Sequence, residues 1–396
     1  MIIRIGALFN PKAKQWITGR KAQQVKWQTQ DFKNAPVIWF HCASLGEFEQ
    51  GRPVIEKIKA QHPAYKILLT FFSPSGYEIR NDYGGADYIF YLPLDTIANA
   101  KKIIEIVKPK VVFFVKYEFW FNYLNELKKN KIATYLISGI FRENQYFFKP
   151  YGFWFRKQLS CFTHFFIQDE ESAKLLKSIK YTNATISGDT RFDRVAEITK
   201  NVKPIKVVQE FITNKKVFIA GSTWNEDEQI ISTQNFKELG FKIIIAPHEI
   251  HEHRLAQLET NFAKYNCLRF SKANEQNVKI ADLLIIDNIG TLSHLYQYGS
   301  FAFIGGGFGK GIHNILEAAT FGLPVIFGPN YKKFTEAKQL IQFGGAFSVA
   351  SSKQFNETIQ LLMNNNKLQI AADVARKYVV EKTGAADIIL SAIKLQ

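Results

Sequence analysis

The sequence predicts an α/β protein built from two doubly wound parallel sheets of the Rossmann-like type. Short apolar runs alternate with helical stretches along the first half of the chain, and the same alternation starts again after a charged segment. Such alternation indicates parallel strands, because each helix carries the chain back across the sheet. The 396 residues suit two domains of ordinary size, which we expect at residues 1–198 and 199–396.

Each expected strand is a short apolar run that ends at a turn of small or polar residues. In the first half the strands are expected at 35–40, 66–72, 88–91, 111–115, 133–137 and 165–168. In the second half they are expected at 216–220, 242–246, 281–286, 301–304 and 325–327. The strongly aromatic residues 146–159 and the tail at 353–396 are expected to be helical. The charged stretch 196–210, which contains Pro204, is the expected linker.

The composition limits the function classes. Hydrophobic residues make up 46% and charged residues 22%, which is typical of a globular protein and excludes a disordered one. The three cysteines are scattered, so neither a zinc site nor a disulfide framework is expected, and a reducing compartment fits. The formal net charge of +16 favours an anionic partner: a nucleotide, a nucleic acid or an acidic membrane surface.

The N-terminal residues 1–21 are apolar at first and then basic, and no run of eighteen apolar residues follows. One interpretation is an amphipathic anchor with Trp16 and the basic residues at the level of the lipid headgroups. The other is an ordinary first helix that caps a domain. The sequence leaves both open.

The most informative stretch, residues 305–329, reads GGGFGKGIHNILEAATFGLPVIFGP and predicts a glycine loop, a helix and a strand. Without Cβ atoms, Gly305–Gly307 would let backbone N–H groups approach a bound anion. We expect the helix to begin near residues 312–314, with Asn314 and Glu317 on one face and Glu317 able to bind the hydroxyls of a ribose. The alternative is a tight turn followed by a glutamate that suits the helix dipole.

Two further carboxylates follow expected strands in the first half. Glu47 lies at a glycine turn that opens a helix, and Glu118 follows the strand at 111–115, before Phe119 and Trp120. Either could do acid–base work, because open α/β sheets bind ligands at these strand ends. The alternatives are a dipole interaction for Glu47 and pairing with Lys116 or a loop N–H for Glu118.

A group of three histidines is a weak indication of a metal site. His248, His251 and His253 follow an expected strand, but positions i, i+3 and i+5 do not share one face of a helix. We therefore expect no metal site, and no cofactor motif of the Walker A or H-E-x-x-H kind is present.

Nine phrases in these turns, in the same order along the chain, resemble the 3-deoxy-D-manno-octulosonic acid (Kdo) transferases, which are glycosyltransferases of the GT-B type. They are HCASLGEFEQGRPVI, FFSPSGYE, YEFWFNYL, SGIFREN, ISGDTRFD, AGSTWNEDE, APHEIHEHR, DNIGTL and GGGFGKGIHNILEAATFGLPVIFGP.

The resemblance implies transfer of Kdo from CMP-Kdo to a lipid A precursor, without an obligatory metal or cofactor. It implies two domains that face each other across a cleft, with acceptor binding in the first and CMP-sugar binding in the second. It also implies a peripheral protein on the cytoplasmic face of the bacterial inner membrane, whose anionic surface it contacts through the N-terminal segment. The hydrophobic anchor of that segment is shorter here than in the family.

The resemblance also assigns residues. Glu47 falls on the general base, Glu118 on a carboxylate that supports the transition state, and Arg191 where the family usually has lysine. The acceptor-binding residues are Ser44, Gly46 and Ser75. The nucleotide-binding residues are Pro247, His248, Ile289, Gly290, Thr291, Gly305, Gly306, Gly307, Asn314, Ile315, Leu316 and Glu317.

Three of these residues depart from the family pattern. Arg191 keeps the positive charge, His248 replaces an arginine and loses a bidentate fork, and Thr291 replaces a glutamate. One alternative function is a GT-B transferase or epimerase that uses a UDP-sugar. Another is a basic nucleic-acid-binding protein, but the Lys and Arg residues form no stripe, so we expect no nucleic-acid partner.

Overall fold

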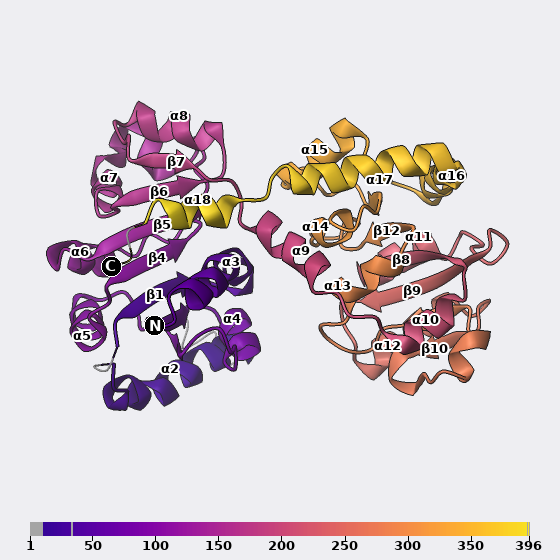
Figure 1. Cartoon of the computed structure of the whole chain (residues 1–396), viewed down its shortest axis with the longest axis horizontal. Helices are drawn as coiled ribbons and strands as arrows, with labels where there is room; N and C mark the ends of the chain where they lie inside the picture. The colour runs from indigo at the N-terminus through magenta and orange to yellow at the C-terminus, as the bar shows by residue number, and fades with distance from the viewer. Residues whose placement is uncertain (1–10, 33–34, 394, 396) are drawn as a thin grey trace. The chain divides into compact units, whose positions relative to one another are not determined.

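The computed structural model describes residues 11–32, 35–393 and 395. The chain forms two compact units (Figure 1). The first unit contains Met1–Arg194 and Lys382–Gln396, and the second contains Val195–Glu381. The division after Arg194 lies close to the predicted one, but the assignment of the C-terminal residues to the second domain was wrong.

The C-terminal residues belong to the first unit because helix α18 (Ala385–Ser391) buries its apolar face there. Ala386, Ile389 and Ile393 share a buried cluster with residues of β1 and α3. The carboxylate of Asp193 also accepts hydrogen bonds from the backbone N–H groups of Gly384 (2.6 Å) and Ala386 (3.2 Å).

The first unit contains a seven-stranded parallel sheet in the order β3-β2-β1-β4-β5-β6-β7. Its strands are β1 (Val37–Cys42), β2 (Lys66–Phe71), β3 (Tyr88–Tyr91), β4 (Val111–Val115), β5 (Ala133–Gly139), β6 (His164–Ile167) and β7 (Ala184–Ile186). Its other helices are α2 (Pro11–Thr29), α3 (Leu45–Gln61), α4 (Pro74–Arg80), α5 (Ile97–Val107), α6 (Phe121–Lys129), η1 (Tyr146–Phe148), η2 (Pro150–Gly152), α7 (Phe153–Leu159) and α8 (Glu170–Ser178).

The second unit repeats this plan with the parallel order β10-β11-β9-β8-β12-β13-β14. Its strands are β8 (Lys216–Thr223), β9 (Phe241–Pro247), β10 (Cys267–Arg269), β11 (Leu283–Ile285), β12 (Phe301–Ile304), β13 (Val325–Phe327) and β14 (Ala346–Ser348). Its helices are α10 (Lys206–Ile212), α11 (Asn225–Ile231), α12 (Glu252–Asn261), η3 (Phe270–Lys272), η4 (Asn277–Ile280), α13 (Leu292–Leu295), η5 (Tyr296–Tyr298), α14 (Leu316–Ala319), α15 (Thr335–Phe343), α16 (Ser352–Met363) and α17 (Asn365–Val380). The two predicted doubly wound parallel sheets are therefore confirmed.

Three local predictions differ from the structure. The expected linker at 196–210 is largely helical, because α9 (Arg191–Lys200) continues across the division and α10 follows. Residues 146–159 form two single turns and the short helix α7, since Pro150 can start a turn but cannot continue a helix. The helix after the glycine loop begins only at Leu316 and has four residues.

The N-terminal segment can be followed from residue 11, and residues 1–10 of the predicted anchor lie outside the described residues. Within α2 the guanidinium of Arg20 lies 3.9 Å from the ring centroid of Trp16, and it donates to the carbonyl groups of Phe72 and Leu92. Trp16 itself contacts the ring of Phe72. This part of the segment thus caps the first unit, and among the described residues no helix is long and apolar enough to cross a bilayer.

Candidate functional site

In both sheets the chain reverses its winding at one pair of neighbouring strands. These pairs are β1 and β4 in the first unit and β8 and β12 in the second. Loops at the carboxyl ends of such a pair diverge to opposite sides and leave a crevice, which is where open α/β sheets bind ligands. Glu47 and Glu118 follow β1 and β4, and the glycine loop follows β12.

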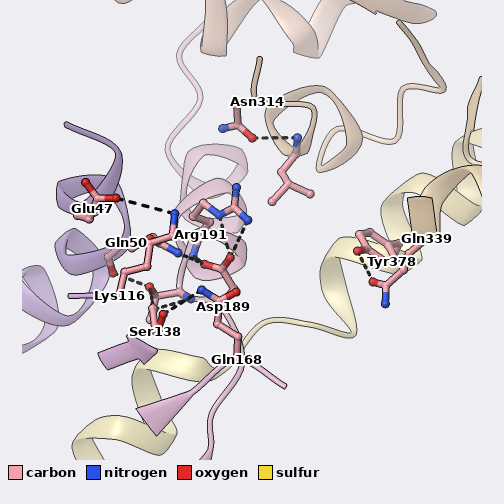
Figure 2. A network of polar contacts seen from close by, with 12 residues as sticks. Glu47, Gln50, Lys116, Ser138, Gln168, Asp189, Arg191, Asn314, Gln339 and Tyr378 are labelled. Carbon is pink, nitrogen blue, oxygen red and sulfur yellow. Dashed lines mark hydrogen bonds and ion pairs between the residues drawn. The ribbon is translucent and has the colours of Figure 1, made fainter. Parts of the chain in front are cut away.

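Glu47 occupies the first turn of α3, which Ser44 caps. The hydroxyl of Ser44 donates to Glu47 Oε2, and Lys116 Nζ lies 3.8 Å from Glu47 Oε1 (Figure 2). The Glu47 side chain is only 14% exposed, so the carboxylate is held in one place by two partners. Of the other predicted acceptor residues, Gly46 donates its N–H to Ser44 Oγ, and exposed Ser75 pairs with Ser73 at the start of α4.

Glu118 is held by aromatic neighbours. Trp120 Nε1 donates to Glu118 Oε2 at 2.6 Å, and Nε2 of the fully buried His41 lies 3.6 Å from the same oxygen. On the other side of the ring, His41 Nδ1 is 2.9 Å from Thr70 Oγ1, which also accepts from Trp39 Nε1. Hydrogen bonds therefore connect Trp39 and Thr70 to the His41 ring, whose Nε2 faces the carboxylate without a hydrogen bond to it.

Lys116 does not pair with Glu118, which was one alternative that the sequence left open. It was the expected alternative partner of Glu118, but its ammonium faces Glu47 instead. Its backbone has φ of +74°, a left-handed conformation that is uncommon for residues other than glycine and is enriched at functional sites. The turn after β4 thus directs Lys116 and Glu118 to different partners.

Arg191 begins α9 and is paired with a buried carboxylate. Asp189 Oδ2 accepts from Arg191 Nε at 2.8 Å, and Asp189 Oδ1 accepts from Gln50 Nε2 at 3.0 Å (Figure 2). Burial acts to raise the pKa of Asp189, but the Arg191 charge and these hydrogen bonds hold that pKa below its usual value. Since α3 supplies both Gln50 and Glu47, this network fixes the helix that carries Glu47.

In the second unit the three glycines allow close packing of backbones. A Cβ on Gly305 would lie 2.2 Å from the Ser222 carbonyl oxygen, and one on Gly307 would lie 2.5 Å from the Gly328 nitrogen. Gly306 has φ of +90°. The N–H of Gly305 donates to the Gly221 carbonyl, and that of Gly306 donates to a carboxylate of α11. Two of the three N–H groups that we expected to face an anion are therefore already used inside the unit.

The carboxylate that holds the glycine loop belongs to Asp227. Its Oδ2 accepts from the N–H groups of Gly306 and Trp224, each at 2.8 Å, and the residue is 1% exposed. Burial raises the pKa of Asp227 to about 6. Asp227 thus ties the turn after β8 to the turn after β12, the two strands at the switch point.

Asn314 and Glu317 are in contact, although Asn314 precedes α14 and does not lie on a helix face with Glu317 as expected. Asn314 Nδ2 donates to Glu317 Oε1 at 3.0 Å, and Asn314 Oδ1 accepts from the Leu316 N–H at the start of α14. Ile315 and Leu316 are 1% and 0% exposed, so their side chains belong to the core. Only the two polar members of this predicted group can meet a ligand through their side chains.

His248 lies in a stack of aromatic rings. Its ring centroid is 4.7 Å from Trp224 and 4.4 Å from His313. Trp224 Nε1 donates to His313 Nε2 at 3.2 Å, and burial lowers the pKa of His313 to about 4. Burial also lowers the pKa of His248. The resemblance would place an arginine guanidinium at position 248. This chain instead has two histidine rings here, in the turns that follow β9 and β12, and burial favours the neutral form of both.

The remaining predicted nucleotide residues occupy two strand ends. Pro247 is buried at the end of β9, whereas Ile289 and Gly290 belong to the exposed turn after β11, and Thr291 precedes α13. Gly290 has φ of +93°, which suits glycine in this turn. Within residues 11–32, 35–393 and 395, no three His, Cys, Asp or Glu side chains are grouped to hold a metal ion.

Comparisons with known proteins agree with this geometry. A family model described as 3-deoxy-D-manno-octulosonic-acid transferase (kdotransferase) matches residues 18–194. A 3-deoxy-D-manno-octulosonic acid transferase of Rickettsia bellii is 28% identical over 342 residues, which cover 84% of this chain and 81% of the relative. The enzyme of that name from Aquifex aeolicus is 29% identical over 339 residues, covering 83% and 87%.

Among solved structures, the UDP-GlcNAc 2-epimerase from Neisseria meningitidis bound to UDP-GlcNAc superposes with a TM-score of 0.63. It is 16% identical, and the match covers 90% of this chain and 98% of the epimerase. At this level of identity the similarity concerns the fold alone, and it confirms the predicted GT-B type.

Proposed function

We propose that this chain, as a glycosyltransferase of the Kdo transferase family, transfers Kdo from CMP-Kdo to a lipid A precursor with Glu47 as general base. The observation that carries this proposal is the position of Glu47 at the switch point of the first sheet, beside Ser44 and Lys116. An acceptor sugar hydroxyl has a high pKa, so a base must take its proton as the new bond to Kdo forms.

Glu118 and Arg191 complete the proposed catalytic set. Trp120 and His41 orient the Glu118 carboxylate, which can then face positive charge that develops on the sugar in the transition state. The side chain of Arg191 is 31% exposed beyond its pairing with Asp189, and its guanidinium can reach an anionic group of the substrate. Ser44, Gly46 and Ser75 are proposed to contact the acceptor.

The second unit is proposed to bind CMP-Kdo. Asn314 and Glu317 present an amide and a carboxylate that suit the hydroxyls of a ribose. The stack of Trp224, His248 and His313 offers flat aromatic surface. Pro247, Ile289, Gly290, Thr291 and the glycine loop are the other proposed nucleotide contacts. The net charge of +16 supports a peripheral location on an anionic membrane, where the lipid acceptor resides.

The test compares Glu47→Gln with Glu49→Gln, a matched change two residues along α3. The enzyme is incubated with CMP-Kdo and a lipid A precursor, and the lipid product is weighed by mass spectrometry. Glu47→Gln is expected to reduce transfer by at least ~100-fold, the usual scale for the loss of a general base, while CMP-Kdo still binds. Glu49 pairs with Arg80 and Arg194 instead, so Glu49→Gln is expected to transfer at a near-normal rate.

Near-normal transfer by a folded Glu47→Gln protein would show that the base is another residue. A parallel incubation with UDP-GlcNAc tests the alternative donor class. Turnover of UDP-GlcNAc without turnover of CMP-Kdo would favour the UDP-sugar enzyme and would overturn the proposed reaction.

A further inference from the structure

Exposed aromatic side chains gather in one segment of the first unit, between η1 and α7. Four of the six aromatic residues that are clearly exposed in the described part of the chain lie between η1 and α7. These four, Tyr146 (61% exposed), Tyr151 (68%), Phe153 (66%) and Trp154 (46%), define what we call the aromatic face. A local group of large exposed rings is unusual for a protein surface that meets only water.

Two rings of the aromatic face stack on neighbouring rings. Trp154 stacks on Phe121 of α6 with centroids 4.7 Å apart, and Tyr146 stacks on Phe155 at 5.1 Å. The Arg156 guanidinium donates to the backbone carbonyls of residues 147 and 149, which fixes the turns beneath them. Rings that are already ordered lose little conformational entropy on binding.

Two further apolar side chains are exposed near the start of α5. Leu94 is 48% exposed and Ile97 is 65% exposed. An open pocket of about 420 Å³ is lined by Ile97, Phe121 and the polar residues of α6. Helices α5, α6 and α7 lie along the same side of the first unit, at the left in Figure 1.

Positive charge predominates in the segments that carry this surface. Segments 94–107, 121–129 and 141–160 contain eight Lys and Arg residues against four Asp and Glu residues. Exposed Lys128, Lys129 and Lys157 are among the eight. A second pocket, of about 240 Å³, combines Arg20, Lys21 and Lys102 with apolar residues that include Leu94. Apolar rings beside cations are complementary to a partner that has an apolar interior and an anionic surface layer.

We propose that the aromatic face, with the cations around it, docks on the surface of an anionic phospholipid bilayer. Tryptophan and tyrosine prefer the boundary between headgroups and acyl chains, because their rings are apolar and their polar atoms remain hydrated. Lysines beside the rings are attracted to the negative surface potential of an anionic leaflet. This inference extends the proposed membrane location to a defined surface, and it is independent of residues 1–10.

The test is flotation of the full chain with vesicles of phosphatidylglycerol and phosphatidylethanolamine. The variants are Tyr151→Ser/Phe153→Ser and the same pair with Trp154→Ser added. We expect each to lower the vesicle partition coefficient at least ~10-fold, since each ring contributes to interfacial binding. The control Ile280→Ser/Phe343→Ser/Ile370→Ser removes exposed apolar groups of the second unit and is expected to float like the wild type.

Binding requires neither CMP-Kdo nor acceptor, so failure of this inference is distinct from failure of the proposed reaction. Wild-type chain that ignores these vesicles, or variants that float as well as the wild type, would overturn the inference. It would equally be overturned if the variants kept their flotation but changed the mass of the protein in solution, since the face would then join two copies. Equal binding to phosphatidylcholine vesicles would remove the role of the cations and contradict the proposal as stated.

Discussion

At the scale of single residues, His41 connects the sheet to Glu118. Its Nδ1 lies against Thr70, and its Nε2 has no hydrogen-bond partner among the described residues although Glu118 is 3.6 Å away. Nε2 is the ring nitrogen that faces the carboxylate, so an N–H on it would point at Glu118. His41 is therefore expected to act as a positioning residue for Glu118.

Replacement of His41 tests this role. His41→Leu removes the N–H and is expected to lower kcat for Kdo transfer at least ~10-fold with little change in KM, because orientation of a charge that acts in the transition state is lost. His41→Gln keeps an N–H and is expected to retain most of the activity. Rates and melting temperatures are measured on both variants. Equal kcat for the two would contradict the role, and equal melting temperatures with unequal kcat would support it.

His313 gives a prediction about pH. Its Nε2 accepts from Trp224, so the folded state favours the neutral ring, and its pKa falls from 6.5 to about 4. Between about pH 4 and 6.5 the unfolded chain binds more protons here than the folded one, so this group makes the free energy of unfolding rise with pH. The stabilisation that comes from keeping His313 neutral is complete above about pH 6.5, and it is lost as the pH falls to about 4.

Urea denaturation of the wild type and His313→Gln measures this effect. The free-energy difference between them is expected to grow by about 1–3 kcal/mol from pH 4 to 6.5, after allowance for partial exposure of the ring. The shifted groups beside it, Asp227 with its raised pKa and His248 with its lowered pKa, are present in both proteins. Parallel stability curves across this range would show that His313 is not held neutral.

Residues in turns were easier to predict than their partners. Glu47 and Glu118 follow recognisable strands, so their place at a strand end could be read from the local pattern. Asp227 and His41 could not be found in this way, because their roles depend on contacts with residues far away in the chain, such as Gly306 and Thr70. Their local phrases, GSTWNEDE and FHCAS, were the only signal.

At the scale of elements, the alternating pattern predicted the strands because strands buried on both faces are continuous apolar runs. Phe40 and Phe113, which stack 4.6 Å apart on neighbouring strands, illustrate such runs. Helix ends were less predictable. The segment before α14 stays irregular because Gly306 and Gly311 have positive φ and the His313 N–H donates back to the Gly305 carbonyl. The backbone conformation and hydrogen bonding of this loop, rather than helix propensity, therefore set where α14 begins.

At the scale of the whole molecule, the return of the C-terminal residues to the first unit was not visible in the sequence. A tail of two or three helices was predicted, and α16, α17 and α18 are found. However, the pattern of apolar residues on α18 shows only that one face is buried, not which sheet it covers. The predicted domain of residues 199–396 therefore included a helix whose apolar side chains lie in the other core.

Neighbouring isoleucines of α18 test which unit the helix stabilises. Ile389 is fully buried in the cluster that contains Phe40, whereas Ile388 is 40% exposed. Ile389→Ala is expected to cost about 2–5 kcal/mol, the usual range for a large-to-small change in a core. Ile388→Ala is expected to stay within about 0.5 kcal/mol. Hydrogen exchange followed by mass spectrometry on each full-length variant locates the loss: protection should fall in β1, while β8 and β9 keep theirs. Lost protection in β8 and β9 instead would mean that α18 supports the second unit and that the predicted division at residue 198 describes the cooperative units after all.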